Sequence, residues 1–203
     1  MVNPLSAPYP KKLNLGSGWD IREGYLNVDS LDHGETNLLA DVTDLPMLDS
    51  GYFDEIVAQD ILEHIPRGKT VPTLREWNRL LSSDGVLFLR VPSLVHLLHR
   101  LSEVRDDPVR ADEVVHRLYG TQAYPGDFHV AGFTAALLDQ RLREAGLRIR
   151  QATLRDEWLF EVYAGKRATD GARMPSEAPP TARRLPRTPR NLLGFLRGKP
   201  IPF

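Results

Sequence analysis

The sequence predicts an α/β domain built on a doubly wound, mainly parallel sheet. Short apolar runs typical of buried strands alternate with amphipathic segments typical of helices, which is the order that such sheets require. The first of these runs ends in a glycine turn, Gly16-Ser17-Gly18, and the second ends at an aspartate, Asp29. The 203 residues are enough for one domain with a sizeable core and a tail.

Five short apolar runs in the first half of the chain predict strands, because each is bounded by Gly, Pro or Asp. They are residues 13–15, 25–29, 37–41, 53–58 and 86–91, of which 37–41 is the weakest. A helix is predicted between the fourth and fifth runs. Pro72 suits its first turn, where a missing N–H costs nothing, and Leu74, Trp77 and Leu81 follow at helical spacing.

The second half predicts one helix and two strands. Thr134 is the expected N-cap of a helix that runs to Ala145, and Gly146 is the expected stop. Residues 147–154 and 159–164 then predict the last two strands. Any helix between the first and second strands must be very short, because few residues separate them.

Composition excludes several classes of function. The chain has no cysteine, so it has no disulfide and no thiolate nucleophile or metal ligand. No run of about 18 apolar residues predicts a membrane span, and residues 1–10, an N-terminal extension, lack the apolar core of a signal peptide. We therefore expect a cytoplasmic protein whose folded domain covers residues 11–166.

The charge is balanced overall but uneven along the chain. From Gly165 onward there are nine Lys/Arg and two Asp/Glu, so the rest of the chain is acidic. An acidic body is not expected to bind nucleic acid, which requires a basic face. Residues 167–203 form a basic, Pro/Arg-rich tail that we expect to be disordered or loosely docked. Its apolar residues 192–196 provide a candidate anchor, for instance in a homodimer.

The glycine turn and two aspartates predict a nucleoside-containing cofactor. Glycines without Cβ let a ligand approach the backbone, and Asp29 is placed to accept both hydroxyl hydrogens of a ribose. Asp41, at the end of the third run, is placed to accept from an adenine amino group. A plain turn and solvated loop aspartates are the alternatives. NAD is disfavoured because the third glycine of its fingerprint is missing.

The chain resembles compact class I S-adenosylmethionine (SAM)-dependent methyltransferases of bacterial glycan and natural-product pathways. The matching stretches include LNLGSG (13–18), GYLNVD (24–29), FDEIVAQDILEHIP (53–66), LREWNRLLSSDGVLFLRVP (74–92) and FHVAGFT (128–134). The resemblance implies a Rossmann-like, seven-stranded mixed sheet with strand seven antiparallel. It also implies that residues 94–128 build the acceptor side.

The resemblance also implies roles for individual residues. The cofactor-binding residues would be Asn14, Gly16, Ser17, Gly18, Asp29, Asp41, Val42 and Gln59, with the glycine turn at the methionine part, Asp29 at the ribose, and Asp41 and Val42 at the adenine. The chain departs from the wider class in two places. Asn14 stands where Asp or Glu is usual, and Asp20 stands where a third glycine is common.

Asp60, His64 and His129 are the candidate catalytic bases. Histidine titrates near neutrality, which suits removal of a proton from an acceptor. A helix cap for Asp60 and simple packing for His64 are the alternatives. No metal site is expected, because His96 and His99 lack a carboxylate at ligand spacing. We expect methyl transfer from SAM to oxygen or nitrogen of a small-molecule or sugar acceptor, with a non-catalytic binding subunit as the alternative.

Overall fold

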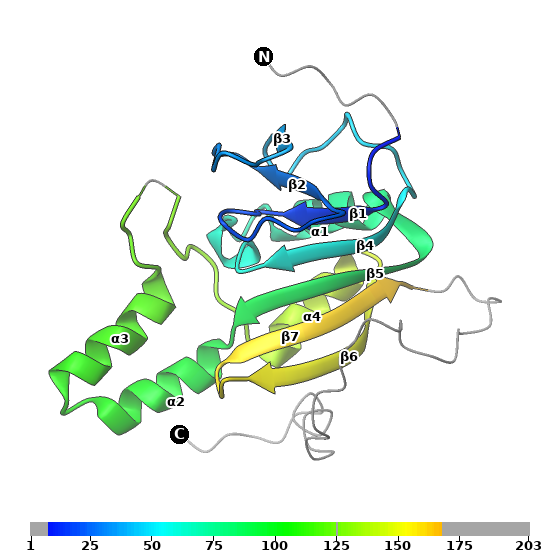
Figure 1. Cartoon of the computed structure of the whole chain (residues 1–203). Coiled ribbons are helices and arrows are strands. Elements are labelled where there is room, and N and C mark those ends of the chain that lie inside the picture. Colours follow the sequence, from blue (N-terminus) through cyan, green and yellow to red (C-terminus); the bar gives the residue numbers. More distant parts are fainter. Residues whose placement is uncertain (1–7, 125, 168–203) are drawn as a thin grey trace.

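A seven-stranded sheet with the order β3-β2-β1-β4-β5-β7-β6 organises the chain (Figure 1). The computed structural model describes residues 8–124 and 126–167. The strands are β1 (Lys12–Leu15), β2 (Leu26–Asp29), β3 (Leu38–Leu39), β4 (Phe53–Gln59), β5 (Leu81–Pro92), β6 (Leu147–Arg155) and β7 (Leu159–Lys166). The first five run parallel to one another and β7 is antiparallel to β5 and β6, which confirms the predicted mixed sheet.

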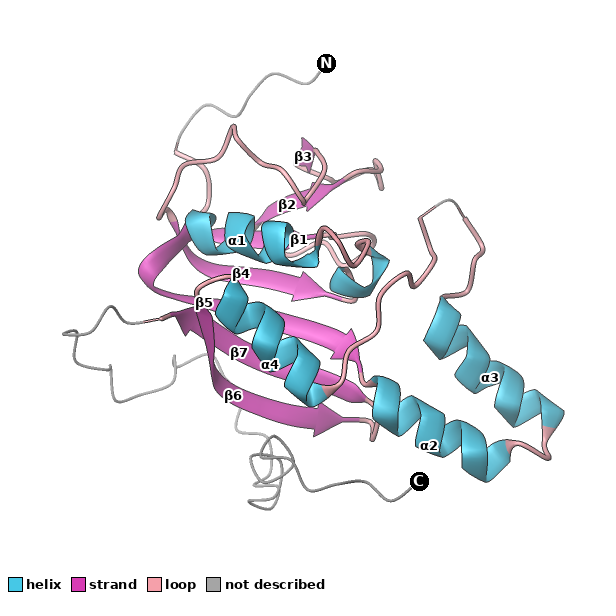
Figure 2. Cartoon of the chain, turned by 180° about the vertical axis from the view of Figure 1, so that it is seen from behind, coloured by secondary structure: helices cyan, strands magenta, loops and turns pink. Residues whose placement is uncertain are grey.

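The helices lie mainly on one face of this sheet. A short 3₁₀ helix, η1 (Leu62–His64), and α1 (Thr70–Leu80) connect β4 to β5, and α4 (Ala135–Glu144) precedes β6. Figure 2 shows α1 and α4 side by side over the same face. The helices α2 (Leu94–Val104) and α3 (Pro108–Tyr119) form a hairpin that projects from the end of β5 (Figure 1). We call this hairpin the helical arm.

The core lies between the sheet and the layer formed by α1 and α4. Leu13, Ile56 and Leu87 occupy neighbouring strands in register and are buried. Trp77 of α1 is fully buried, and its indole N–H donates to the carbonyl oxygen of Val42 at 2.9 Å. This bond satisfies the polar group that burial of a tryptophan would otherwise leave unpaired. Trp77 is therefore a core residue that also holds the segment after β3.

The opposite face of the sheet is polar and aromatic. Lys12 pairs with Glu55 across β1 and β4 at 3.0 Å, and the rings of Phe88 and Tyr163 lie 5.0 Å apart across β5 and β7. Within residues 8–124 and 126–167, no helix covers this face in either ribbon view. The connections after β1 and β2 consist of turns and loops and contain no helix that could cover this side of the sheet.

Several strands begin or end at residues other than those predicted. The predicted strand 37–41 shrinks to β3. The Asn37 side chain accepts from the Asn27 N–H of β2, and the Asp41 side chain accepts from the Thr43 N–H in a turn. The fifth strand starts earlier than predicted, at Leu81, which pairs with Phe53. The N-cap prediction for α4 is confirmed, since the Thr134 hydroxyl accepts from the Leu137 N–H at 3.1 Å.

Part of the predicted N-terminal extension packs on the domain. The ring of Tyr9 lies 4.5 Å from that of Tyr52, and its hydroxyl donates to Asp49. The tail predicted for residues 167–203 lies outside the described residues except for Arg167. None of the helices in the described part of the chain has the length and hydrophobicity needed to cross a membrane.

Candidate active site at the carboxyl ends of the strands

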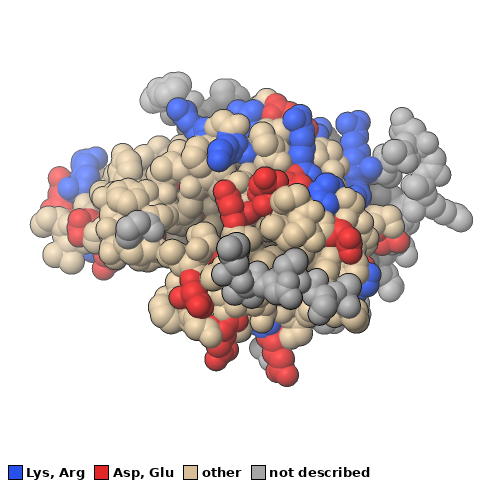
Figure 3. Space-filling model, turned by 90° about the horizontal axis from the view of Figure 1, so that it is seen from above, with Lys and Arg blue, Asp and Glu red and all other residues tan. Residues whose placement is uncertain are grey.

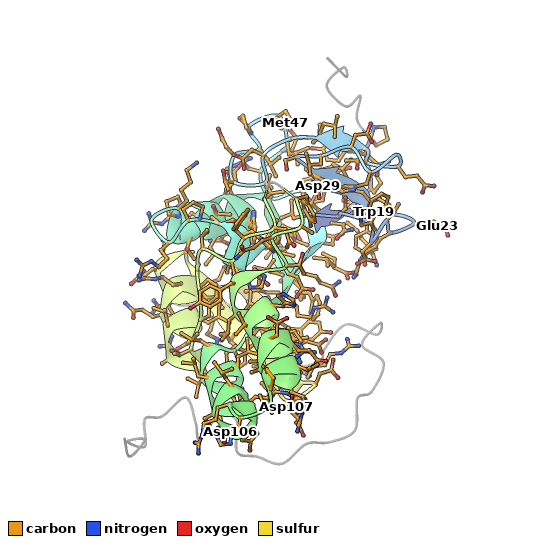
Figure 4. The ribbon with its side chains drawn as sticks, turned by 90° about the vertical axis from the view of Figure 1, so that its left-hand side faces the viewer. Trp19, Glu23, Asp29, Met47, Asp106 and Asp107 are labelled. Carbon is orange, nitrogen blue, oxygen red and sulfur yellow. The ribbon has the colours of Figure 1, made fainter. Side chains whose placement is uncertain are left out.

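The predicted site residues gather where β1, β2 and β4 end. In a parallel sheet the carboxyl ends of neighbouring strands share one edge, and ligands bind there. Figure 4 looks onto this edge. Asp29 is the last residue of β2, and Trp19 lies on the neighbouring loop after β1.

Gly16 and Gly18 adopt positive φ angles of 63° and 48°, so the predicted turn is present. A Cβ on Gly16 would lie 2.7 Å from the side chain of Ile61, which fills the space beside it. A Cβ on Gly18 would meet nothing within 4 Å. Of the two glycines, Gly18 is therefore the one beside open space. The hydroxyl of Ser17 between them is buried and has no hydrogen-bond partner among the described residues.

Asp29 holds the glycine turn from the end of β2. One carboxylate oxygen accepts from the Gly18 N–H at 2.8 Å, and the other accepts from the Leu31 N–H at 2.9 Å. The imidazole of His33 lies 3.9 Å from the second oxygen, and its ring lies 4.8 Å from that of Trp19. The carboxylate is thus fixed by backbone donors beside the open position at Gly18.

Asn14 and Gln59 contact the loop after β1. The amide of Asn14 is 2% exposed and donates to the Asp20 carbonyl at 2.7 Å and to Asn27 at 3.0 Å. Gln59, at the end of β4, donates to the Asp20 carboxylate at 3.1 Å. Both side chains therefore position this loop, Asn14 from inside the sheet and Gln59 from its edge.

Asp41 and Val42 lie on the turn after β3. One oxygen of the exposed Asp41 carboxylate accepts from the Thr43 N–H at 2.9 Å. Val42 is buried, and its carbonyl oxygen accepts from the indole N–H of Trp77. The backbone at this turn is thus held by the core while the Asp41 side chain faces solvent.

Asp60 forms an ion pair rather than a helix cap. Its carboxylate oxygens accept from the Arg90 guanidinium at 2.9 and 3.1 Å, and a third, shorter contact joins the same two groups. The N-cap position of η1 is Ile61, with no side-chain cap. Asp60 adopts a φ of 51°, in the left-handed region. Because Arg90 occupies the carboxylate, Asp60 is poorly placed to take a proton from an acceptor.

His64 and His129 meet at the same edge. Their ring centroids are 4.8 Å apart, in an edge-to-face arrangement. The Nδ1 atom of His129 contacts the carbonyl oxygen of Arg117 at 3.1 Å. Burial lowers the pKa of His129, and the neighbouring His64 lowers it further. A neutral imidazole is the form that accepts a proton.

Glu63, which the sequence analysis passed over, lies beside the two histidines. Its side chain is buried, and neither carboxylate oxygen has a hydrogen-bond partner within the described part of the chain. Burial raises the pKa of the Glu63 carboxyl well above its ordinary value. Glu63 stands directly before the candidate base His64 in the sequence. Its other neighbour, His129, comes from a segment more than 60 residues away.

The segment after α3 returns to this edge, where the N–H groups of Val130 and Ala131 donate to the Glu63 carbonyl. It turns at Gly120, where a Cβ would lie 2.4 Å from the Asp127 carbonyl oxygen. Burial raises the pKa of Tyr124, and the charges of Asp127 and Asp29 raise it further, which places Tyr124 in the field of the β2 carboxylate. Tyr119 at the end of α3 is exposed, and so are Tyr124, Phe128 and Val130 on the loop.

Comparison with known proteins agrees with this geometry. A family model described as a methyltransferase domain matches residues 13–89, from β1 into β5. No curated protein sequence matches the chain.

Solved structures share the fold at low sequence identity. Trans-methyltransferase CalH, in complex with S-adenosylhomocysteine (SAH), is 19% identical with a TM-score of 0.52; the match covers 79% of this chain and 52% of CalH. This chain thus spans about half the length of that protein. The Pyrococcus horikoshii protein PH0226 is 14% identical with a TM-score of 0.53, over 77% of this chain and 81% of that one.

A third structure is the 1,6-didemethyltoxoflavin-N1-methyltransferase of Burkholderia thailandensis, with its acceptor and SAH bound. It is 14% identical with a TM-score of 0.52, over 76% of this chain and 70% of that one. These structures share the sheet, and the family model covers the part of the sheet that carries the glycine turn and both aspartates. Residues 13–89 therefore match a methyltransferase domain, and the chain shares its fold with CalH and the toxoflavin methyltransferase.

Proposed function

We propose that the chain binds SAM and transfers its methyl group to an oxygen or nitrogen atom of a small-molecule or sugar acceptor. The observation that supports this proposal is that a glycine turn with an aspartate and a pair of histidines lie at the same edge of the sheet. The glycine turn with Asp29 suits a nucleoside-containing cofactor. The His64–His129 pair suits proton removal from an acceptor.

The residues after β1 fit SAM better than a dinucleotide. A pyrophosphate is normally held at the N-terminus of a helix that follows the glycine turn. Here residues 16–25 contain turns and no helix. Open space at Gly18, the unpartnered Ser17 hydroxyl and the Asp29 carboxylate remain for a ligand without phosphates. Two similar structures, those of CalH and the toxoflavin methyltransferase, contain bound SAH.

His129 is the group best placed to take a proton. SAM, when bound, supplies an electrophilic methyl carbon, so the protein must align the acceptor and, for a hydroxyl, remove its proton. A carbonyl oxygen can only accept a hydrogen bond, so the contact with Arg117 requires the His129 proton on Nδ1. The lone pair then lies on Nε2, and the lowered pKa keeps it available near neutral pH.

The loop of residues 119–130 supports an acceptor with an apolar or ring-shaped part. Its exposed side chains include Tyr124, Phe128 and Val130, and its backbone carries His129. Aromatic side chains bind sugar rings and apolar small molecules through their faces. The acceptor would then sit between this loop and the cofactor.

Calorimetry with SAM tests the cofactor assignment. Replacing Asp29 by Ala should weaken SAM binding by about 2–3 kcal/mol, or roughly 30- to 150-fold, the range for hydrogen bonds to a charged group. Asp32→Ala is a matched control, because Asp32 is an exposed loop aspartate whose side chain binds only the Gly34 N–H among the hydrogen bonds found. Equal SAM affinity in the two variants would remove the assignment.

Transfer of a labelled methyl group to extracted metabolites tests the reaction. The wild-type chain should label a small molecule, and His129→Gln should lower turnover about 10²- to 10⁴-fold with SAM affinity kept, if the acceptor is a hydroxyl. A chain that binds SAM and labels no acceptor would be a non-catalytic binding subunit instead.

A further inference from the structure

We propose that Glu63, His64 and His129 form a binding site for a divalent transition-metal ion. One ligand atom from each residue lies within 4.8 Å of the other two. Metal–nitrogen and metal–oxygen bonds of about 2.0–2.2 Å place tetrahedral ligands roughly 3.4 Å apart. Small side-chain rotations therefore suffice to close the three atoms around an ion.

Two of the three residues have buried polar atoms without hydrogen-bond partners among the described residues. Glu63 is 2% exposed, and neither of its carboxylate oxygens has a hydrogen-bond partner in the described residues. The Nδ1 atom of His64 is also buried and, within the same part of the chain, without a partner. Buried polar atoms nearly always have partners, so three orphaned atoms at one place call for a ligand. A cation satisfies the carboxylate and the imidazole at once.

His129 is already oriented as metal-binding histidines are. Such residues almost always donate their second ring N–H to a carbonyl or carboxylate, which fixes the ring and directs the other nitrogen to the metal. In His129 the contact of Nδ1 with the Arg117 carbonyl has this role. Its Nε2 atom is then the free ligand.

The backbone holds the three residues together although they are far apart in sequence. The carbonyl oxygen of Glu63 accepts from the N–H groups of Val130 and Ala131 at 2.9 and 3.0 Å. These bonds join η1 to the loop that carries His129. The two histidines are only partly buried, so an ion has a path from solvent to the buried carboxylate.

The ligand types select the ion. Two imidazoles and one carboxylate suit zinc, iron or another first-row transition metal, whereas magnesium and calcium prefer oxygen ligands. Three protein ligands leave positions open for an oxygen of the acceptor. This last role rests on the proposed function: a metal-bound hydroxyl loses its proton to water more readily, so the ion rather than the His129 lone pair would activate it.

Titration of the tag-free, chelator-treated chain with Co²⁺ tests the site. Visible absorption and calorimetry monitor the binding of the ion. The wild-type chain should bind one ion, with the absorption bands of a nitrogen- and oxygen-ligated cobalt centre. Glu63→Gln and His129→Ala should each weaken binding by more than the roughly 10- to 100-fold typical of losing an outer partner. His116→Ala is the control, since His116 is an exposed histidine paired with Asp112 at 3.7 Å, and should bind as wild type does.

Thermal unfolding of each variant establishes that it is folded, and His64→Gln provides a third variant if one fails. No cobalt binding by the wild-type chain, or equal binding in the wild type and the Glu63 and His129 variants, would overturn the site. SAM affinity in the same samples separates the two proposals. Intact SAM binding without metal binding defeats only the metal site, whereas metal binding without SAM binding defeats only the methyl-transfer proposal.

Discussion

Gly16 and Gly18 occupy the same turn but are required for different reasons. Both have positive φ angles, which cost an L-residue about 1–2 kcal/mol. Only at Gly16 would a Cβ also strike a neighbour, the side chain of Ile61 at 2.7 Å. Gly16 thus allows η1 to approach β1, whereas Gly18 lies beside open space, where we propose that SAM binds.

This difference gives a prediction for two variants. Gly16→Ala should lower the free energy of unfolding by about 2–4 kcal/mol, because backbone strain and overpacking add. Gly18→Ala should lose only the strain, about 1–2 kcal/mol, but should weaken SAM binding tenfold or more. Denaturant unfolding and calorimetry on both variants provide the comparison. A larger stability loss at Gly18 than at Gly16 would contradict it.

Single residues could be predicted where local sequence decides their geometry. The turn at Gly16-Ser17-Gly18 and the carboxylate of Asp29 follow from short stretches around each strand end. The pairing of Asp60 with Arg90 does not, because it depends on the register of β4 against β5. Nor could Glu63 be linked to His129, since the backbone hydrogen bonds that bring their segments together run from Val130 and Ala131 to the distant Glu63 carbonyl.

At the scale of elements, α1 anchors the segment between β3 and β4. Glu76 accepts from the Leu45 N–H at 3.0 Å and pairs with Arg79 at 2.7 Å. Arg79 donates in turn to the carbonyl oxygens of Leu45 and Leu48 at 2.9 Å. These charged hydrogen bonds replace regular secondary structure as the support of this long connection.

The same network predicts a pH dependence. The hydrogen bonds from Arg79 hold the pKa of Glu76 below its ordinary value of 4.5. Because the folded pKa is lowered, the stabilisation is complete above the unfolded pKa and is lost as the pH falls through the folded one. Glu76→Gln should cost about 1.5–3 kcal/mol at pH 7, and this cost should shrink below pH 4.5.

Unfolding at several pH values checks this prediction. Glu103→Gln is the control, because Glu103 is an exposed glutamate paired with His99 on α2 and should change stability by less than about 1 kcal/mol. A cost for Glu76→Gln that stays constant down to pH 3 would show that the carboxylate charge is not responsible.

Elements with strong apolar runs were predictable and those held by side-chain bonds were not. β1, β4 and β7 lie within two residues of their predicted positions, since each contains at least three consecutive buried residues. β3 has two residues, and Asp41 after it forms an Asx turn that competes with strand pairing. The pairing of two helices into the arm was not predicted, because only Leu97, Val104 and Val114 of their residues are buried.

At the scale of the whole molecule, charge is distributed without a single dominant sign on the visible face. In Figure 3 acidic and basic side chains are interspersed with other residues. A continuous basic surface is what nucleic-acid backbones bind. This face therefore fits the expectation of a non-nucleic-acid acceptor, which remains a prediction.

The helical arm has a small core of its own, separate from that of the sheet. Leu97, Val104 and Val114 are buried there, and Trp158 from the turn between β6 and β7 packs against them. The guanidinium of Arg117 lies 5.4 Å from the centre of the Trp158 ring. The carbonyl oxygen of Arg117 contacts His129, so the position of the arm fixes one of the proposed site residues.

Trp158→Ala should therefore loosen the arm and disturb the acceptor side while sparing the sheet. Loss of a partly buried aromatic side chain should cost about 1–3 kcal/mol locally, below the 3–5 kcal/mol of a fully buried one. Since each 1.4 kcal/mol is a factor of ten, amide exchange in α2 and α3 should accelerate roughly 5- to 150-fold, with the exchange of β1, β4 and β5 unchanged. SAM affinity should be kept, whereas cobalt binding should weaken because Arg117 no longer holds the His129 ring in place.

Val109→Ala is the matched control, since Val109 is 71% exposed on α3. Equal exchange in the two variants would show that the arm is held by contacts other than Trp158, and acceleration throughout the sheet would show that the arm and the sheet unfold as one unit.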